Sequence, residues 1–393
     1  MPEDFLLLDP GLAPLTDEVR AAMDEQLVPY RSPDFESVYE RAQDGLEYVF
    51  TASTLDDTVT SEGGTPLILD GTATMAMEAA VANVVSEGDE VVALVNGKYG
   101  RRFARIADRY TDDVIRVEAS WGESIPVGKV ADAVSPDTDL VTMVHNETST
   151  GLLNPVEPVG ELANEADATF VVDGSTSIGG DEFRIDDWGV DLAITDAHEA
   201  LAAPPGLSAV YVTDRARGAI DGDGAPFYED LDAHLRAAER HQTPFAAAEP
   251  LFHALAVAVE AIEAEGMVDR IARHRTQAAA VREGFEAMGL ELFGNPTGPT
   301  DYSNTTTTVA LPDSVRGDGA DEFEAELRNR NVAIGGGQGH LDGEVFRVSN
   351  LGHFKADEVV RGIETVGEAL EAVGADVDPE AGMLAAKERL DQG

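Results

Sequence analysis

Four polar segments of this sequence each follow a short apolar run, and their side chains could bind an anion or move a proton. They are the turn Gly71–Thr74, the string His145–Gly151, Asp173 with the residues after it, and the pair His198 and Glu199. Backbone amides and hydroxyls at the start of a helix favour an anion such as phosphate. Carboxylates transfer protons, but they cannot form the imine that a lysine amine forms with an aldehyde.

Each segment also has an ordinary structural interpretation. A glycine–threonine turn is common between a strand and a helix, and an aspartate at a strand end often caps the next helix. The string His145–Gly151 could be a buried polar network that holds its own loop. Their position favours a site, because ligands of parallel sheets bind at the carboxyl ends of the strands.

The hydrophobic pattern predicts the elements that would bring these segments together. Short apolar runs separated by helices indicate an α/β fold with a mostly parallel sheet covered on both faces. A helix over Thr74–Val85 follows the first predicted strand. The predicted strands are Pro66–Asp70, Val91–Val95, Val114–Val117, Leu140–Val144, Thr169–Asp173, Leu192–Thr195 and Ala209–Val212.

The last third of the chain predicts a smaller α+β region. Pro250–Gly266 is an amphipathic helix that we expect to link the two parts, and another helix starts near Val268. The Gly/Asp-rich segment Gly218–Tyr228 predicts an exposed loop. The predicted elements beyond are the strands Thr305–Leu311, Val332–Ile334 and Val345–Val348 and a helix over Phe323–Arg328.

Composition predicts a soluble globular protein. The chain has 393 residues, of which 43% are hydrophobic, enough for a substantial core. No run approaches the roughly 20 apolar residues that span a bilayer. The start Met1–Asp4 lacks the basic residues of a secretory signal, so we expect a cytoplasmic location. Cysteine is absent and the histidines lack metal-binding spacing, so we expect no disulfide and no metal.

The charge balance is strongly acidic. There are 75 acidic and 27 basic residues, which gives a formal net charge of −48 spread over the whole chain. Such a surface suits a cytosol of very high salt, where the Debye length shrinks to about 3 Å at about 1 M. We therefore expect an extreme halophile, of haloarchaeal type. The charge argues against nucleic acid and anionic membranes as partners.

The segment Thr195–Gly206, with His198, Glu199 and the run Ala200–Gly206, resembles the cofactor-anchoring segment of the class V pyridoxal-phosphate (PLP) aminotransferases. Further segments resemble the alanine–glyoxylate and serine–pyruvate type of that family, in the family's order, from Leu8 to Gly352. The resemblance implies fold type I of the PLP-dependent transferases. It also implies a large cofactor-binding domain over 15–260 and a small domain built from 1–14 and 261–393.

The resemblance assigns cofactor roles to residues from several segments. Tyr99 would stack on the pyridine ring, and Asp173 would pair with the ring nitrogen and keep it protonated. Ser175, in the same string as Asp173, is also implied to bind the cofactor. Thr243 matches the family's threonine that reaches the phosphate of the neighbouring subunit, which implies a homodimer with shared sites. The residues implied at the phosphate or the ring substituents are Gly71, Thr72, Ala73, Thr74, Thr148, Ser149 and His198.

The substrate side follows from the same resemblance. Arg347 matches the arginine that binds the substrate carboxylate, for which a planar guanidinium is well suited. The implied reaction is transfer of an amino group between a small amino acid, of alanine or serine type, and a 2-oxo acid such as pyruvate or glyoxylate. Two loops resemble the family's substrate-side loops, with altered residues: Asp9–Pro14 and Tyr30–Pro33.

Glu199 stands where the family carries its Schiff-base lysine. A carboxylate can move a proton there but cannot tether the cofactor, so PLP would be held non-covalently. We expect burial and nearby acidic groups to raise the pKa of Glu199. A protonated His198 could offset part of the repulsion between Glu199 and a phosphate. None of the four lysines, Lys98, Lys129, Lys355 and Lys387, is an obvious substitute.

Three interpretations of the chain remain open at this point. It keeps the aminotransferase scaffold with little or no turnover, or it works as a lyase or dehydratase on PLP or its amine form with Glu199 or His198 as proton shuttle. In the third, it is a non-catalytic binding subunit that pairs with a complete relative. A recent or deliberate substitution at position 199 is a further possibility, since the flanking residues match the family.

Overall fold

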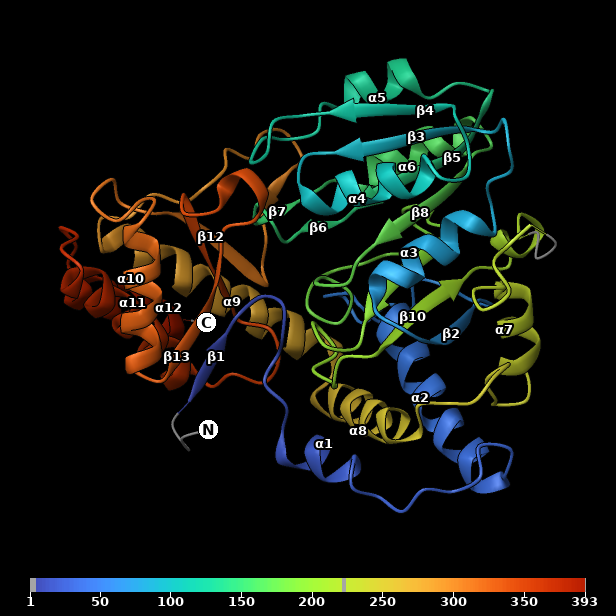
Figure 1. Ribbon diagram of the computed structural model, residues 1–393, viewed down its shortest axis with the longest axis horizontal. Helices are drawn as coiled ribbons and strands as arrows, with labels where there is room; N and C mark the ends of the chain where they lie inside the picture. The colour runs from blue at the N-terminus through green and yellow to red at the C-terminus, as the bar shows by residue number, and fades with distance from the viewer. Residues whose placement is uncertain (1–4, 221–223, 393) are drawn as a thin grey trace.

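The computed structural model describes residues 5–220 and 224–392, and within them the largest sheet has seven strands in the order β2-β10-β9-β8-β5-β3-β4 (Figure 1). Every strand that the sequence predicted for this region is present. The strands are β2 (Thr65–Asp70), β3 (Glu90–Val95), β4 (Val114–Glu118), β5 (Thr138–Val144), β8 (Thr169–Asp173), β9 (Leu192–Asp196) and β10 (Leu207–Val212).

The sheet is parallel except at β10, which runs antiparallel to both of its neighbours, β2 and β9. Val144 lies beside Asp173, and Asp173 beside Ile194, so β5, β8 and β9 end at one edge. The inner strands are mainly apolar and buried because both faces are covered, as the apolar runs predicted. Polar residues that follow these strands therefore lie close together.

Helices cover both faces of this sheet. Helix α3 (Ala73–Ala82) packs on β9 and β10, α4 (Lys98–Ala107) on β3 and β5, and α5 (Val127–Ala133) on β4. Helix α6 (Val156–Glu165) packs on β8, while α2 (Pro33–Thr51) and α7 (Leu231–Ala238) pack against β2. Helix α3 ends at Ala82, earlier than predicted, because the Asn83 side chain donates to the carbonyls of Ala79 and Glu229.

A second sheet lies at the other end of the molecule, on the left in Figure 1. Its order is β1-β13-β14-β12, and its helices bury an apolar cluster separate from that of the large sheet. Strand β1 was not predicted, because it has three residues and a partner far away in sequence. The strands are β1 (Leu6–Leu8), β12 (Thr306–Ala310), β13 (Val332–Gly336) and β14 (Val345–Ser349), and the helices are α9 (Met267–Ala287), α10 (Gly319–Asn329), α11 (Ala356–Ala372) and α12 (Pro379–Gln392).

The remaining elements connect these parts. The amphipathic helix expected near Pro250 is α8 (Glu249–Glu265), and α1 (Asp17–Ala22) packs against it. A small sheet joins β6 (Asn146–Glu147), β7 (Leu152–Leu153) and β11 (Asp301–Tyr302). In the expected loop after Gly218, Phe227 is 83% exposed, while positions 221–223 lie outside the described residues, as do Met1–Asp4.

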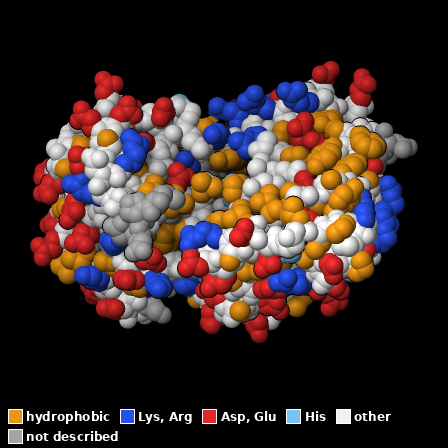
Figure 2. Space-filling view, turned by 60° about the horizontal axis from the view of Figure 1, so that its bottom comes forward, with side chains coloured by type: hydrophobic (Ala, Val, Ile, Leu, Met, Phe, Trp, Pro, Cys, Tyr) orange, Lys and Arg blue, Asp and Glu red, His pale blue; other side chains and the backbone are white. Residues whose placement is uncertain are grey.

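Acidic side chains are spread over both halves of the face that Figure 2 shows. They agree with the acidic excess of the whole sequence, which is not gathered in one segment. In the described part of the chain, no helix combines the length and the apolar character needed to cross a membrane.

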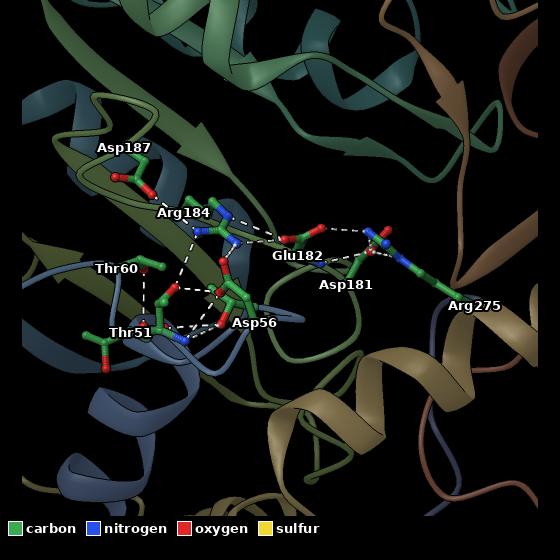
Figure 3. Close-up of polar contacts among 10 residues, drawn as sticks. Thr51, Asp56, Thr60, Asp181, Glu182, Arg184, Asp187 and Arg275 are labelled. Carbon is green, nitrogen blue, oxygen red and sulfur yellow. Dashed lines mark hydrogen bonds and ion pairs between the residues drawn. The ribbon is translucent and has the colours of Figure 1, made fainter.

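Two arginines tie the segment after Asp173 to the rest of the molecule (Figure 3). Arg184 bonds both Asp56 and Glu182, and Arg275 from α9 pairs with Asp181 and Glu182. The loop that follows β8 is thereby held from both sides, by the region after α2 and by α9. It cannot shift without breaking charge-assisted bonds.

Arg270, on α9, is fully buried. Its Nε donates to the carbonyl of Gly179, its Nη2 to the carbonyl of Ala200, and its Nη1 pairs with Glu265. Burial lowers the pKa of Arg270 to about 10, which still leaves it charged at neutral pH. Ala200 follows Glu199 directly, so this one guanidinium fixes the backbone beside the position of greatest interest.

Replacing Arg270 with leucine should lower the free energy of unfolding by about 3–5 kcal/mol, because Glu265 and two carbonyls lose a buried partner. Denaturant unfolding at constant salt measures it. The exposed pair of Arg328 and Glu324 supplies the control: Arg328→Leu should cost at most about 1 kcal/mol. Equal losses in the two variants would contradict the assigned role of Arg270.

Candidate active site

A cavity of about 130 Å³ lies at the carboxyl edge of the seven-stranded sheet. The structure brings nine of the sequence-predicted side chains to it, from the starts of α3 and α4 and from the ends of β5, β8 and β9. Their roles towards a ligand stay predictions. The nine are Thr72, Ala73, Thr74, Tyr99, Thr148, Asp173, Ser175, His198 and Glu199.

Tyr99 enters the cavity from the first turn of α4. Burial raises its pKa to about 12, and the nearby Glu199 carboxyl adds to the effect, so the phenol stays protonated. The Arg102 guanidinium lies 4.7 Å from the Tyr99 ring centroid, and the Lys98 Nζ lies 5.8 Å from it. Arg102 lines the cavity one helical turn after Tyr99, although sequence reasoning gave it no role.

The turn that presents Tyr99 is fixed by a second buried carboxylate. Glu147 accepts bonds from the backbone amides of Tyr99 and Gly100 and from the Ser149 hydroxyl. A Cβ at position 97 would lie 2.2 Å from the Glu147 side chain, so glycine is required for this approach. The polar string at His145–Gly151 thus holds the start of α4, a role that the sequence had left open.

Asp173 is buried at the end of β8. Its Oδ1 accepts bonds from the Ser175 amide over 2.9 Å and the Ser175 hydroxyl over 2.6 Å. Burial raises the pKa of Asp173 to about 6, although these two bonds oppose the shift. A cationic N–H placed against this carboxylate would compensate its desolvation and favour the charged form.

Glu199 is only 9% exposed and lines the same cavity. Burial raises its pKa well above the usual value, and the negative charges of Asp196 and Asp173 raise it further. Arg102 and Arg347 oppose the shift without cancelling it. The expectation of a raised pKa at this position, made from the residue types, agrees with this environment.

Asp196 also lines the cavity, although the sequence analysis gave it no role. It ends β9, and its Oδ2 accepts a bond from the Ala73 amide, the first residue of α3, over 2.6 Å. Its Oδ1 forms an ion-pair contact with the Nδ1 of His198. Its place after an apolar run is visible in the sequence, as for Asp173, but its bond to the start of α3 depends on the fold.

Four predicted residues do not line the cavity. The Ser149 hydroxyl is turned to Glu147, and the Thr243 hydroxyl donates to the carbonyl of Phe245. Arg347, on β14, is buried and donates to the carbonyls of Gly336 and Thr148. Its charge nevertheless reaches both Tyr99 and Glu199, which links β14 to the cavity. The fourth residue is Gly71, whose turn precedes α3.

The first altered N-terminal loop contacts the backbone of a cavity residue, and the second contacts the Thr243 segment. The Ala13 amide donates to the carbonyl of His198 over 2.9 Å. Arg31 donates from Nη1 to the carbonyl of Thr243 and from Nη2 to that of Pro244. The three cavity acids do not form a metal site, since no suitable group of ligands occurs among residues 5–220 and 224–392.

Comparisons with known proteins agree on one family. The model of the family described as aminotransferase class V matches residues 25–341. The chain is 35% identical over 391 residues to an uncharacterized aminotransferase of Methanocaldococcus jannaschii, covering 98% of this chain and 97% of that one. It is 30% identical over 397 residues to the L-aspartate–glyoxylate aminotransferase of Paracoccus denitrificans, covering 98% and 95%.

A solved structure extends this likeness to the fold. Pyridoxamine–pyruvate aminotransferase from Mesorhizobium loti matches with a TM-score of 0.91 at 27% identity, covering 100% of this chain and 99% of that one. The chain therefore belongs to the class V aminotransferases and has fold type I of the PLP-dependent enzymes. Class V aminotransferases are PLP-dependent.

The cavity suits the pyridine ring of PLP better than it suits the aldehyde or the phosphate. Tyr99 offers an aromatic face and Asp173 a carboxylate for a ring nitrogen. Glu199 offers no amine for a covalent link, and Lys98 does not line the cavity. At the start of α3, the Ala73 amide could donate to a phosphate, but it already donates to the Asp196 carboxyl group.

Replacing Glu199 with glutamine should flatten the pH dependence of stability. A carboxyl whose pKa is raised on folding stabilises the protein below its unfolded pKa, and this contribution is lost as pH rises through the folded pKa. The free energy of unfolding should therefore fall less in Glu199→Gln than in the unmodified chain as the pH rises above the usual glutamate pKa of about 4.3. Denaturant melts at constant salt measure both. Glu118→Gln, at an exposed position, should leave the fall unchanged, and an unchanged fall in Glu199→Gln would contradict the assignment.

Proposed function

We propose that this chain holds a vitamin B6 ring without a covalent link and keeps the scaffold of an amino-transfer enzyme with little turnover. The observation that carries the proposal is the meeting of Tyr99, Asp173 and Glu199 in one cavity, with an acid at the lysine position. The inherited reaction is amino transfer between a small amino acid and a 2-oxo acid such as pyruvate or glyoxylate. Relatives named for glyoxylate, and a neighbour named for pyridoxamine and pyruvate, support these ligand classes.

Each cavity residue has a defined task in this proposal. A bound B6 ring supplies an electron sink for bonds at the substrate amine carbon. Asp173 holds the proton of the ring nitrogen, and Tyr99 covers a ring face. Arg347 orients the substrate carboxylate, since its bonds to the carbonyls of Gly336 and Thr148 use Nε and Nη1 and leave further N–H donors for a ligand. Thr72, Thr74 and Thr148 offer hydroxyls around the ring.

Glu199 acts as a proton carrier in the place of the lysine. Burial raises its pKa, which favours the protonated form, so it can give a proton to a bound ligand and take one back. The same property favours a second candidate, a lyase or dehydratase that works without the lysine. His198, paired with Asp196, would relay protons beside Glu199 in that case.

The assembly and habitat belong to the same proposal. We propose a homodimer in which Thr243 of each subunit contributes to the other's site; the Arg31 bonds to Thr243 and Pro244 hold this segment in place. Residues 15–260 would form the cofactor-binding domain, with 1–14 and 261–393 as the small domain. The net charge of −48 supports a halophilic, cytoplasmic protein.

Restoring lysine should create the missing covalent site. Treated with pyridoxal or PLP and then borohydride, Glu199→Lys should gain an adduct on the peptide that contains residue 199, read by mass spectrometry. Amino transfer from alanine to glyoxylate should rise by about 100-fold or more, the scale of a positioned proton-transfer group.

Glu199→Gln is the matched control, since it removes the acid without supplying an amine, and it should gain neither property. An adduct on Lys98 in the unmodified chain would contradict non-covalent binding. Failure of Glu199→Lys to form any adduct, while folded, would contradict the proposed cavity for the ring.

Salt should control both stability and assembly. At about 1 M KCl, where the Debye length is about 3 Å, the chain should sediment as a dimer of twice 41.7 kDa and melt at a higher temperature than at about 0.1 M. The physical reason is screening of the self-repulsion of the acidic surface. A monomer at all salt concentrations would contradict the dimer, and a salt-independent melting temperature would contradict halophilic adaptation.

A further inference from the structure

The start of α3 is already occupied by an anion that belongs to the protein. Asp196 reaches across from the end of β9, and its Oδ2 accepts the Ala73 amide bond. The helix N-cap residue, Thr72, makes no side-chain cap bond, so Asp196 serves as the cap. The carboxylate is 3% exposed and lines the cavity, which places its charge inside the ligand's space.

The second oxygen of Asp196, Oδ1, is buried and lies 2.5 Å from the Nδ1 of His198. A carboxylate oxygen has two lone pairs, so Oδ1 can accept one further bond. A buried carboxylate oxygen of this kind favours a ligand group that donates a proton to it. A hydroxyl can donate, whereas a phosphate dianion has only acceptor oxygens.

The other charges at the cavity do not reverse this preference. Asp173 and Glu199 line it with Asp196, and their mutual repulsion is the reason each raises the pKa of a neighbour. Arg102 is the lining residue of opposite permanent charge, and its Nη1 donates to the Thr74 hydroxyl. His198 faces Asp196 as its own partner. A dianion would thus meet the carboxyl groups of Asp173 and Asp196, with that of Glu199 beside them, against one arginine.

We propose that Asp196 makes this cavity selective for B6 vitamers without a phosphate, pyridoxamine or pyridoxal, whose 5′-hydroxyl would donate to Oδ1. This inference rests on the proposed function only in taking a B6 ring as the ligand. It assigns Asp196 as the residue that determines specificity at the end of the cavity nearest α3.

Equilibrium binding at constant high salt tests the proposal with four probes: pyridoxamine, pyridoxal and the 5′-phosphate of each. The unmodified chain should bind each free vitamer at least about tenfold more tightly than its phosphate, because an unscreened like charge faces the phosphate. In Asp196→Asn, which keeps the shape and removes the charge, that ratio should fall at least about tenfold.

Asp139→Asn is the matched control. Asp139 also accepts a backbone bond, from the Glu90 amide, but it is exposed and away from the cavity, so the ratio should not change. Phosphates that bind the unmodified chain as tightly as the free vitamers would overturn the selectivity and leave the proposed function standing. An unchanged ratio in a folded Asp196→Asn variant would overturn the role of Asp196. Binding of none of the four probes would overturn both proposals.

Discussion

The site depends on the concentration of three acidic side chains at one edge of a parallel sheet. Asp173 and Asp196 end neighbouring strands, and Glu199 follows in the next turn, so the sheet itself sets their proximity. Burial disfavours the charged form of a carboxyl group, and a nearby negative charge disfavours it further. Two outcomes relieve this repulsion: the raised pKa of Glu199 favours its protonated form, and the Asp196 carboxyl group accepts a bond from the Ala73 amide at the start of α3. These two outcomes define what the cavity can bind, because one end lacks an amine and the other already holds an anion.

A surrounding shell keeps this cluster in place. Arg270 fixes the backbone beside Glu199, while Arg275 and Arg184 hold the loop after Asp173. Glu147 orders the start of α4 and so positions Tyr99. In a chain with 75 acidic residues, Arg270, Arg275 and Arg184 are therefore committed to structure, and few positive charges are left to neutralise a ligand. Arg102 and Arg347 are the cations whose charges oppose the raised pKa of Glu199.

Much of this arrangement could be predicted from the sequence, and the remainder depended on contacts between distant residues. The strands of the large sheet were predicted because continuous apolar runs indicate strands buried on both faces, and nine predicted site residues share the cavity because they follow those strands. The short strand β1 was missed, since its partner β13 lies more than 300 residues away. Asp196 and Arg102 were missed for a related reason. Their roles depend on α3 and α4 meeting the strand ends, which periodicity does not reveal. Ser149 is the opposite case: it was predicted to bind the cofactor, but its hydroxyl donates to Glu147 and helps to hold the loop.

A crystal structure of the unmodified protein soaked with pyridoxal at high salt tests the central claim most directly. The account predicts a ring beside Tyr99 with its nitrogen at hydrogen-bond distance from Asp173, and no continuous density from the ring to any side chain. A ring bound outside this cavity, or joined covalently to Lys98 or another lysine, would contradict it.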